Sequence, residues 1–261
     1  MARDSPPCLS LLLSLAVAEA VATVVAVVIL MLVWELTGIA SGGWVPSIFA
    51  VMAKIGPVLA EPTSLSNMWI TTYRILIAFV ATTILGSILG IAMGLNRYFE
   101  AFFRPLVVIS LAIPDPVYII FAILILGTDE SSGIIALAIA VLPFVLNVVH
   151  SAVKSRDTQL DGMATVYRFG RRRYLTEVII GQFGPALIVA ARTSFAFCWK
   201  VVVLVEAISQ PLGVGSQIYT AFRLLRFDEM IAVAVVFIVL MRAVDTVAFG
   251  YLERRALAWA R

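Results

Sequence analysis

Six long apolar stretches, separated by polar segments, dominate the chain of 261 residues. A helix needs about 20 apolar residues to cross the roughly 30 Å hydrocarbon core of a bilayer. Each stretch approaches or exceeds that length, so we expect an all-α membrane protein with six transmembrane helices in a single domain, residues 1–261. The predicted spans cover about 17–37, 70–94, 105–127, 133–150, 185–208 and 230–250.

Lysine and arginine residues are distributed unevenly between the two sides that these spans create. Twelve lie on one side and three on the other, or four if Arg74 at the edge of the second span is included. Cytoplasmic loops carry the excess of basic residues, so both termini and the loop 154–185 are predicted to be cytoplasmic. The twelve are Arg3, Arg97, Arg104, Lys154, Arg156, Arg168, Arg171, Arg172, Arg173, Arg254, Arg255 and Arg261, and the three are Lys54, Arg223 and Arg226.

Helical spacing of apolar residues also predicts a short helix, residues 46–59, which is too short to span. We expect it to lie as an amphipathic helix at the outer, periplasmic surface. In the second span, Gly86, Gly90 and Gly94 recur every four residues. Such a ridge of small residues allows another helix backbone to approach closely, which predicts a packing surface.

The composition supports lipid as the solvent and argues against chemistry within the chain. Hydrophobic residues make up 62% and charged residues 13%, against about 25% charged in soluble domains. The two cysteines, Cys8 and Cys198, lie far apart, and the one histidine, His150, is expected to be structural. The sequence contains no phosphate-binding loop and no metal-ligand cluster. We therefore predict no enzymatic activity, metal or cofactor in this chain, and any ATP would be bound by another subunit.

Ionisable residues inside the spans are the main candidates for function, because a charge at mid-helix costs about 2.5–3.5 kcal/mol on insertion scales. Arg242 and Asp245 are three residues apart in the sixth span and are expected to pair. Glu206, near the outer end of the fifth span, is expected either to line a gate or to accept hydrogen bonds from the turn 213–215. Lys200 either reaches a surface or a neutralising partner, or it lines a pathway for an anionic solute.

A second candidate region is the third span, where Pro114, Asp115 and Pro116 follow one another. The prolines break the regular helix. Irregular backbone at membrane depth is tolerated only inside protein or along a wet cavity, so residues 113–118, including Tyr118, are predicted to border the pathway. Phe195 and Trp199 flank Lys200 and are expected either to pack between helices or to contact solute.

The loop 154–185 is the most highly charged connection. Leu160, Met163, Ala164 and Tyr167 recur at spacings of three and four, which predicts a short amphipathic helix. Such a helix either rests on the membrane surface or docks a cytosolic partner.

Several short segments together resemble the permease subunits of bacterial ABC importers for aliphatic sulfonates, taurine, nitrate, bicarbonate and pyrimidine precursors. Their order and spacing, from about residue 46 to 255, carry the resemblance. The segments are Thr72-Tyr73-Arg74, Ile113-Pro114, Gly127-Thr128-Asp129-Glu130-Ser131, Leu160-Asp161-Gly162-Met163-Ala164, Val178-Ile179-Ile180 with Pro185, Trp199, Glu206, and Gly213-Val214-Gly215.

The resemblance implies the type I importer permease fold, in the inner membrane, with a second permease copy or paralogue. It also implies two cytoplasmic ATPase subunits, which would hold ATP and Mg, and an extracytoplasmic solute-binding protein. The loop is similar to the family's coupling helix, which places ATPase coupling at about 157–173. The coupling residues that the resemblance implies are Asp157, Leu160, Asp161, Met163, Ala164, Tyr167 and Arg168. The pathway residues, predicted above from the prolines, the aromatic residues and the charges inside the spans, are Pro114, Asp115, Tyr118, Phe195, Trp199, Lys200 and Glu206.

The loop departs from the family pattern, in which a Glu is followed six residues later by a Gly. Ungapped alignment places Gly162 and Arg168 at these positions, whereas a local shift would place Asp161 and Gly170 there. The run Arg171–Arg173 is also unusual, and we expect it to contact anionic lipid rather than an acidic ATPase surface.

The alternative function is a secondary transporter driven by an ion gradient, which would use Glu206 and Asp245 as coupling acids. Such transporters usually have inverted repeats, and no internal repeat is visible in the sequence.

Overall fold

The computed structural model describes residues 7–42 and 44–256, and this part of the chain is helical with connecting turns. Arg3 and Arg261, which contribute to the predicted orientation, lie outside the described residues. The helices are α1 (Pro7–Ala40), α2 (Ile48–Ala60), α3 (Pro62–Leu95), α4 (Arg97–Ala112), α5 (Asp115–Leu126), α6 (Glu130–Lys154), α7 (Thr158–Val166), α8 (Arg171–Arg173), the π-helix η1 (Tyr174–Ile179), α9 (Ile180–Ser209), α10 (Val214–Arg223) and α11 (Phe227–Ala256).

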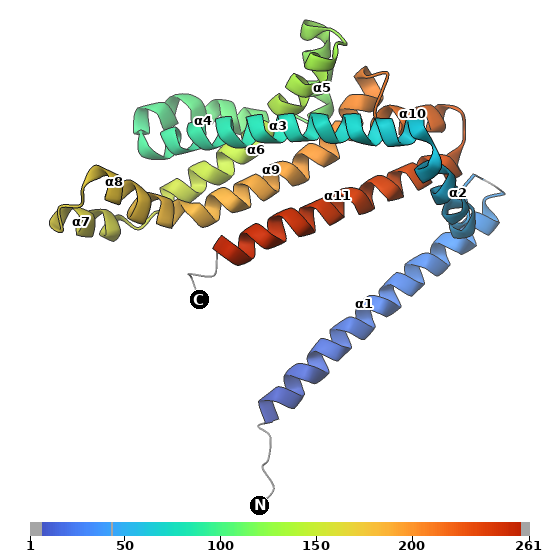
Figure 1. The fold of residues 1–261 in the computed structure, drawn as a ribbon, viewed down its shortest axis with the longest axis horizontal. Coiled ribbons are helices and arrows are strands. Elements are labelled where there is room, and N and C mark those ends of the chain that lie inside the picture. Colours follow the sequence, from blue (N-terminus) through green and yellow to red (C-terminus); the bar gives the residue numbers. More distant parts are fainter. Residues whose placement is uncertain (1–6, 43, 257–261) are drawn as a thin grey trace, which may run out of the picture.

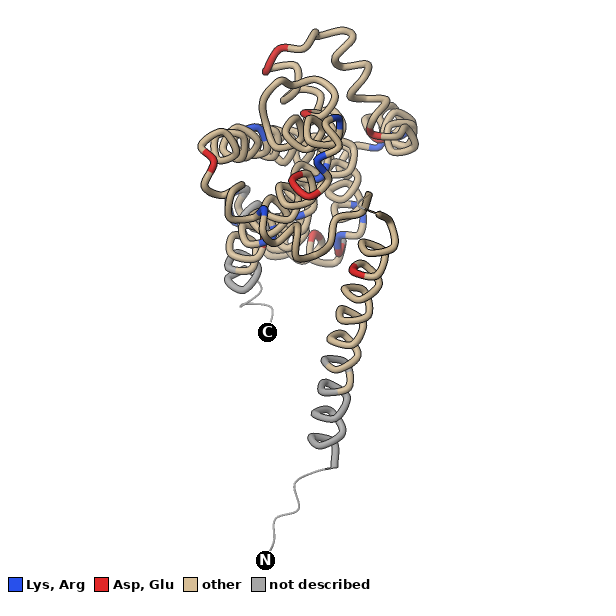
Figure 2. The backbone as a smooth tube through the Cα atoms, turned by 90° about the vertical axis from the view of Figure 1, so that its right-hand side faces the viewer, with Lys and Arg blue, Asp and Glu red and all other residues tan. Residues whose placement is uncertain are grey.

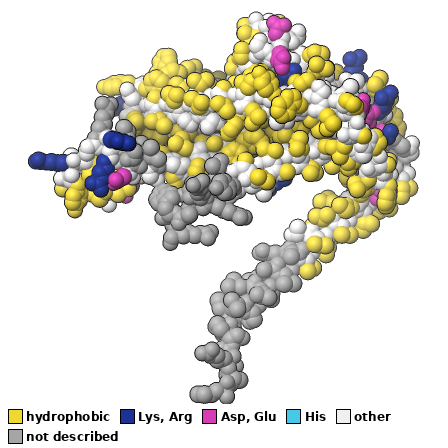
Figure 3. Space-filling model, viewed as in Figure 1, with side chains coloured by type: hydrophobic (Ala, Val, Ile, Leu, Met, Phe, Trp, Pro, Cys, Tyr) yellow, Lys and Arg dark blue, Asp and Glu magenta, His cyan; other side chains and the backbone are white. Residues whose placement is uncertain are grey.

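Helices α3, α6 and α9 form the centre of the bundle, and α10 and α11 pack against α9. In Figure 1, α3, α9 and α11 run along the long axis of the body. The core contains fully buried residues from several helices, among them Ile75, Val141, Val202 and Phe237. Between the ends of the body the visible surface is broadly hydrophobic, while charged side chains gather at both ends (Figure 3). This arrangement suits lipid around the middle and water at the ends.

The predicted glycine ridge is confirmed as the contact between α3 and α6. A methyl group at Gly86 would lie 2.7 Å from Val145 Cγ1, and one at Gly94 would lie 2.4 Å from Val153 Cγ1. Gly90 faces Val149 in the same way, at 2.8 Å from its Cβ. A valine every four residues on α6 therefore meets a glycine every four residues on α3, and the two helices approach closely along the whole ridge.

Helix α1 leaves the body at its α2 end (Figures 1 and 2). The Trp34 indole donates to the Pro46 carbonyl at 3.0 Å, and Glu35 accepts from the Ile48 amide at 2.8 Å. Helix α2 is the short helix predicted from residues 46–59, and it packs its buried Val51 and Val58 against α11 and α3. No described residue of α1 from 21 to 40 is buried, so its apolar surface is open to lipid or another subunit.

Five of the described helices are long and apolar enough to span a membrane, and α4 and α5 meet the same criterion when taken together as one bent pair, which gives up to six spans. The break predicted at Pro114 and Pro116 is confirmed, with the axes of α4 and α5 meeting at 105°. Proline disfavours helical geometry in the residue before it, and Ile113 accordingly has an extended backbone. Pro116 is tolerated because it lies in the first turn of α5.

The loop between the fourth and fifth spans differs from expectation in its second half. We predicted that the fifth span begins at about Pro185, but the chain is helical from Arg171 onward, through η1 and into α9. Pro185 thus lies inside α9 rather than at its start. The predicted amphipathic helix is confirmed as α7.

Candidate functional site

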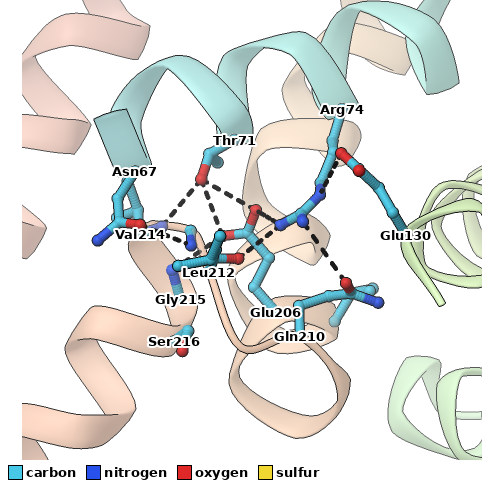
Figure 4. A network of polar contacts seen from close by, with 12 residues as sticks. Asn67, Thr71, Arg74, Glu130, Glu206, Gln210, Leu212, Val214, Gly215 and Ser216 are labelled. Atoms are coloured by element: carbon cyan, nitrogen blue, oxygen red, sulfur yellow. Dashed lines mark hydrogen bonds and ion pairs between the residues drawn. The ribbon is translucent and has the colours of Figure 1, made fainter. Parts of the chain in front are cut away.

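A buried polar network joins the end of α9 to the N-terminal part of α3 (Figure 4). The Glu206 side chain is fully buried, and its Oε1 accepts from Arg74 Nη1 at 2.8 Å. Thr71 Oγ1 lies 2.9 Å from both carboxylate oxygens and accepts from the Val214 amide. The Gly215 amide donates to Glu206 Oε2 at 2.9 Å. The carboxylate therefore holds both α3 and the start of α10.

The turn between α9 and α10 is built around the same carboxylate. Arg74 Nη1 also donates to the Leu212 carbonyl at 2.7 Å, and the Gly213 amide donates to Asn67 Oδ1 at 3.0 Å. Gly213 has φ of 126°, a conformation that L side chains rarely adopt, and a methyl group there would lie 2.3 Å from Glu206 Cδ. The glycine of this turn is therefore required both by backbone geometry and by the buried acid.

The network extends to the start of α6 through Arg74 and Gln210. Gln210 Nε2 donates to the Asp129 carbonyl at 3.1 Å, and Glu130 Oε1 lies 3.8 Å from Arg74 Nε. A buried ion pair is stable only when its remaining hydrogen-bonding groups are satisfied. Here the Glu206 carboxylate is well supplied with donors, whereas Arg74 Nε is buried without a hydrogen bond.

Of the two expectations for Glu206, hydrogen bonding to the following turn is observed. Its assignment to the translocation pathway stays a prediction. Arg74 and Thr71 were not identified as its partners from the sequence, because they lie more than 130 residues away along the chain. The one available signal was an arginine at the edge of an apolar span, which requires an acid nearby.

Lys200 projects from the exposed face of α9. Its Nζ lies 5.9 Å from the ring centroids of both Phe197 and Trp199. Within the described part of the chain, no carboxylate lies within ion-pair distance of it. Phe195 has a different environment: it is buried and makes an edge contact with Phe79 at 5.8 Å. Phe195 therefore packs in the core, whereas Lys200 lies at the surface of the protomer.

The bend between α4 and α5 is closed by Tyr118, whose hydroxyl donates to the Ser110 carbonyl at 2.8 Å. Pro114 is exposed and Asp115 is half-buried in the first turn of α5. The next turn of α5 is anchored in the core by the fully buried Ile119. Residues 113–118 therefore form an ordered bend whose outer surface is open, and their contact with a pathway stays a prediction.

The predicted pair in the sixth span is confirmed: Arg242 Nη1 lies 2.9 Å from Asp245 Oδ2. Arg192 of α9 contacts the same oxygen at 3.3 Å, a partner that the sequence did not reveal. Asp245 is buried, so this acid links α9 to α11.

At the opposite end of the molecule, three of the predicted coupling residues hold α7 in place. Asp157 caps the helix by accepting from the Gln159 amide at 2.7 Å. Asp161 accepts from Arg156 Nε at 3.1 Å and from the Tyr174 hydroxyl at 2.9 Å. The hydrogen bond between Tyr174 and Asp161, together with burial and the Asp161 charge, raises the pKa of Tyr174. Ala164, the third of these residues, is buried.

The other coupling residues present an apolar surface. Leu160, Met163 and Tyr167 are 36%, 40% and 71% exposed, and lie on one side of α7. Val166, which the sequence pattern did not single out, is 78% exposed beside them. An exposed apolar face on a helix outside the spans is typical of a docking surface.

Arg168 ends α7 in the left-handed conformation, with φ of 51°. The Phe169 amide donates to the Ala164 carbonyl and the Arg168 amide to the Thr165 carbonyl, which is the Schellman pattern usually built with glycine. Gly170 does not have a positive φ. Arg168, which the ungapped alignment places at the position of the family glycine, therefore has a backbone conformation that glycine ordinarily supplies.

In the basic run Arg171–Arg173, the last arginine has contacts within the protomer. Arg173 pairs with Glu177 at 2.9 Å and its guanidinium lies 4.7 Å from the Phe169 ring.

Residues 82–257 match the protein family described as "Binding-protein-dependent transport system inner membrane component". The chain is 23% identical over 231 residues to a protein described as the aliphatic sulfonates transport permease SsuC of Bacillus subtilis. The matched region covers 87% of this chain and 83% of the relative. The chain is 20% identical over 211 residues to the nitrate import permease NrtB of Synechocystis sp., covering 77% and 76%. A solved inward-facing structure of the MetNI methionine ABC transporter superposes with a TM-score of 0.62 at 17% identity, covering 76% of this chain and 99% of that chain.

Proposed function

Because this chain belongs to the family of binding-protein-dependent transport system inner membrane components, we propose that it lines one half of the solute pathway in an ATP-binding-cassette importer for a small anion. It is a multi-pass inner-membrane permease with the fold of type I ABC importer permeases, and it is not an enzyme. The solute class, the partners and the working surfaces are the parts that we propose.

The position of Lys200 is the observation that supports an anionic solute. Its ammonium group lies on an exposed face of an apolar span and has no carboxylate partner within the described residues. Turned toward lipid, such a charge would cost about 2.5–3.5 kcal/mol on insertion scales. A water-filled pathway between two permeases removes that cost, and there the charge attracts anions. The sulfonate and nitrate named for the two relatives are anions as well.

Two features support the proposed partners: the sequence has no nucleotide-binding loop, and α7 has an exposed apolar face. Two cytoplasmic ATPase subunits would therefore hold ATP and Mg, and an extracytoplasmic binding protein would deliver the solute. The exposed face of α7, formed by Leu160, Met163 and Tyr167, is the surface that we assign to the ATPase. This places both termini and α7 in the cytoplasm, and the network around Glu206 near the outer surface.

The alternative, coupling to an ion gradient, has less support. Glu206 and Asp245 are the acids that it would use, and each is held by arginine.

The solute proposal is tested by uptake in proteoliposomes that contain the complete importer. We expect Lys200→Met to lower the initial uptake rate of a transported anion by about tenfold or more, since a hydrogen bond to a charged group contributes about 1.5–3 kcal/mol. Lys200→Arg is the matched control, because it keeps the charge. Unchanged uptake by Lys200→Met at normal expression would overturn the proposal.

The docking proposal is tested separately by co-purification of the ATPase. Tyr167→Asp places a charge on the apolar face of α7 and is expected to abolish co-purification. Thr165→Asp, on the opposite side of the same helix, is the control and should retain the ATPase. Equal retention by both variants would show that α7 does not dock there.

A further inference from the structure

A basic cavity lies between the start of α4 and the end of α6, away from the sites described above. Its volume is about 410 Å³. The residues that line it are Glu100, Arg104, His150, Ser151, Lys154 and Ser155. We propose that this cavity binds the phosphate group of an anionic phospholipid.

The charges are arranged with one acid at the floor and basic groups around it. Glu100 is only 12% exposed, and its carboxylate contacts Lys154 Nζ, His150 Nε2 at 3.3 Å and Arg104 Nη1 at 3.7 Å. Arg104 and Lys154 are 68% and 53% exposed at the rim. The acid neutralises one of these two cations, so the rim keeps a net positive charge while its side chains are held in position.

The donors left at the rim suit a phosphate. Guanidinium carries five N–H donors, and Arg104 approaches Glu100 through Nη1 at 3.7 Å, which is too long for a hydrogen bond. Lys154 supplies a second cation, and Ser151 adds an exposed hydroxyl. Arginine and lysine together with hydroxyl groups are the usual ligands of phosphate oxygens.

The surroundings favour a lipid over a free phosphate. Val108, one turn beyond Arg104 on the same side of α4, is 60% exposed. An acyl chain can lie along this side of α4 while the head group occupies the cavity. Basic pockets between membrane helices on the cytoplasmic side bind anionic head groups, and the charge distribution places this cavity on that side. Lys154 also lies three residues before Asp157, the N-cap of α7. A lipid bound to both Arg104 and Lys154 would therefore contact α4 and the residues that lead into α7.

The test is retention of phosphatidylglycerol by the purified full-length chain, transferred into nanodiscs of phosphatidylcholine with increasing phosphatidylglycerol and analysed by native mass spectrometry. Each basic residue near an anionic membrane contributes about 1 kcal/mol, or about fivefold in affinity. The double variant Arg104→Gln with Lys154→Gln should therefore weaken retention by about 25-fold. Both side chains are exposed, and a triple variant that adds Glu100→Gln leaves no unpaired acid at the floor, so equal loss of lipid in the double and triple variants would exclude a damaged fold as its cause.

Arg97→Gln is the matched control. It removes an exposed arginine from the first turn of the same helix, outside the cavity, and should retain the lipid as the wild type does. Equal loss in Arg97→Gln would indicate general surface attraction, and no loss in the double variant would also overturn the proposal. If inorganic phosphate binds the detergent-solubilised wild type but not the double variant, while all variants retain phosphatidylglycerol equally, the cavity takes free phosphate and the lipid assignment is wrong.

Discussion

Arg168 and Leu225 occupy equivalent positions at the ends of α7 and α10, and both have left-handed backbones, with φ of 51° and 57°. In each case the next amide reaches back to the helix: Phe169 to the Ala164 carbonyl and Arg226 to the Ala221 carbonyl, both at 2.9 Å. Glycine is the residue that ordinarily fills this position. Both helix ends therefore carry strain that the sequence alone does not show.

Replacing either residue by glycine should stabilise its helix end. A left-handed L residue costs about 1–2 kcal/mol, and the greater flexibility of unfolded glycine offsets part of the gain, so we expect about 0.5–1 kcal/mol for Arg168→Gly and for Leu225→Gly. Amide hydrogen exchange at Phe169 and Arg226 measures the effect. Arg168→Ala retains the strain and is the control; equal protection in Arg168→Ala and Arg168→Gly would contradict the prediction.

The ion pair between Arg74 and Glu206 should be far more sensitive to substitution than surface pairs. Removing one partner of a buried pair costs about 3–5 kcal/mol, because the other charge remains buried. We expect Glu206→Gln and Arg74→Met each to lose this much in unfolding experiments in detergent, and the double variant to lose less than the sum. Arg226→Gln, which removes an exposed partner of Glu229, should cost less than about 1 kcal/mol.

The glycine ridge predicts a compensating exchange between α3 and α6. Gly94→Ala drives a methyl group into Val153 and should cost about 1–3 kcal/mol, as overpacking does. Val153→Gly removes the obstructing atoms, so the double variant should be more stable than the sum of the single effects by about 0.5–3 kcal/mol. Gly184→Ala in α9, with open space around it, is the neutral control. Strict additivity of the two changes would refute the close contact.

The hydrogen bond from Tyr174 to Asp161 predicts a specific alkaline titration. It raises the pKa of Tyr174 above its ordinary value of 10.0. Because the folded pKa lies above the unfolded one, the contact contributes its full stability below about pH 10 and loses it as the pH rises through the raised pKa. Absorbance titration should show one of the seven tyrosines ionising later in the wild type than in Asp161→Ala. Identical titrations would exclude the contact, and Tyr174→Phe identifies the residue concerned.

Sequence patterns were sufficient where the deciding interaction is local. Apolar length predicted the spans, the prolines predicted the break after Ala112, and a spacing of three residues predicted the pair of Arg242 with Asp245. The angle of 105° at the break was not predictable, because it depends on how α5 packs against α6 and α9.

Interactions between distant segments escaped prediction for the same reason. Arg74 meets Glu206 only because α3 packs beside the end of α9, and Arg192 joins Asp245 only because α9 packs on α11. The left-handed conformation of Arg168 is likewise a property of the folded backbone, although the missing family glycine pointed to that residue. On the proposed function, the solute would be selected by surfaces that a second subunit completes.

The interlocked glycines and valines of α3 and α6 also limit how this protein can move. Both ridges repeat every four residues, or about 6 Å along a helix axis, so a smaller slide would press valine methyl groups into the opposing backbone. We therefore expect α3 and α6 to move together as one rigid unit. On the proposed function, alternating access would then be carried by elements outside this pair, such as α11 and the bent α4–α5 pair.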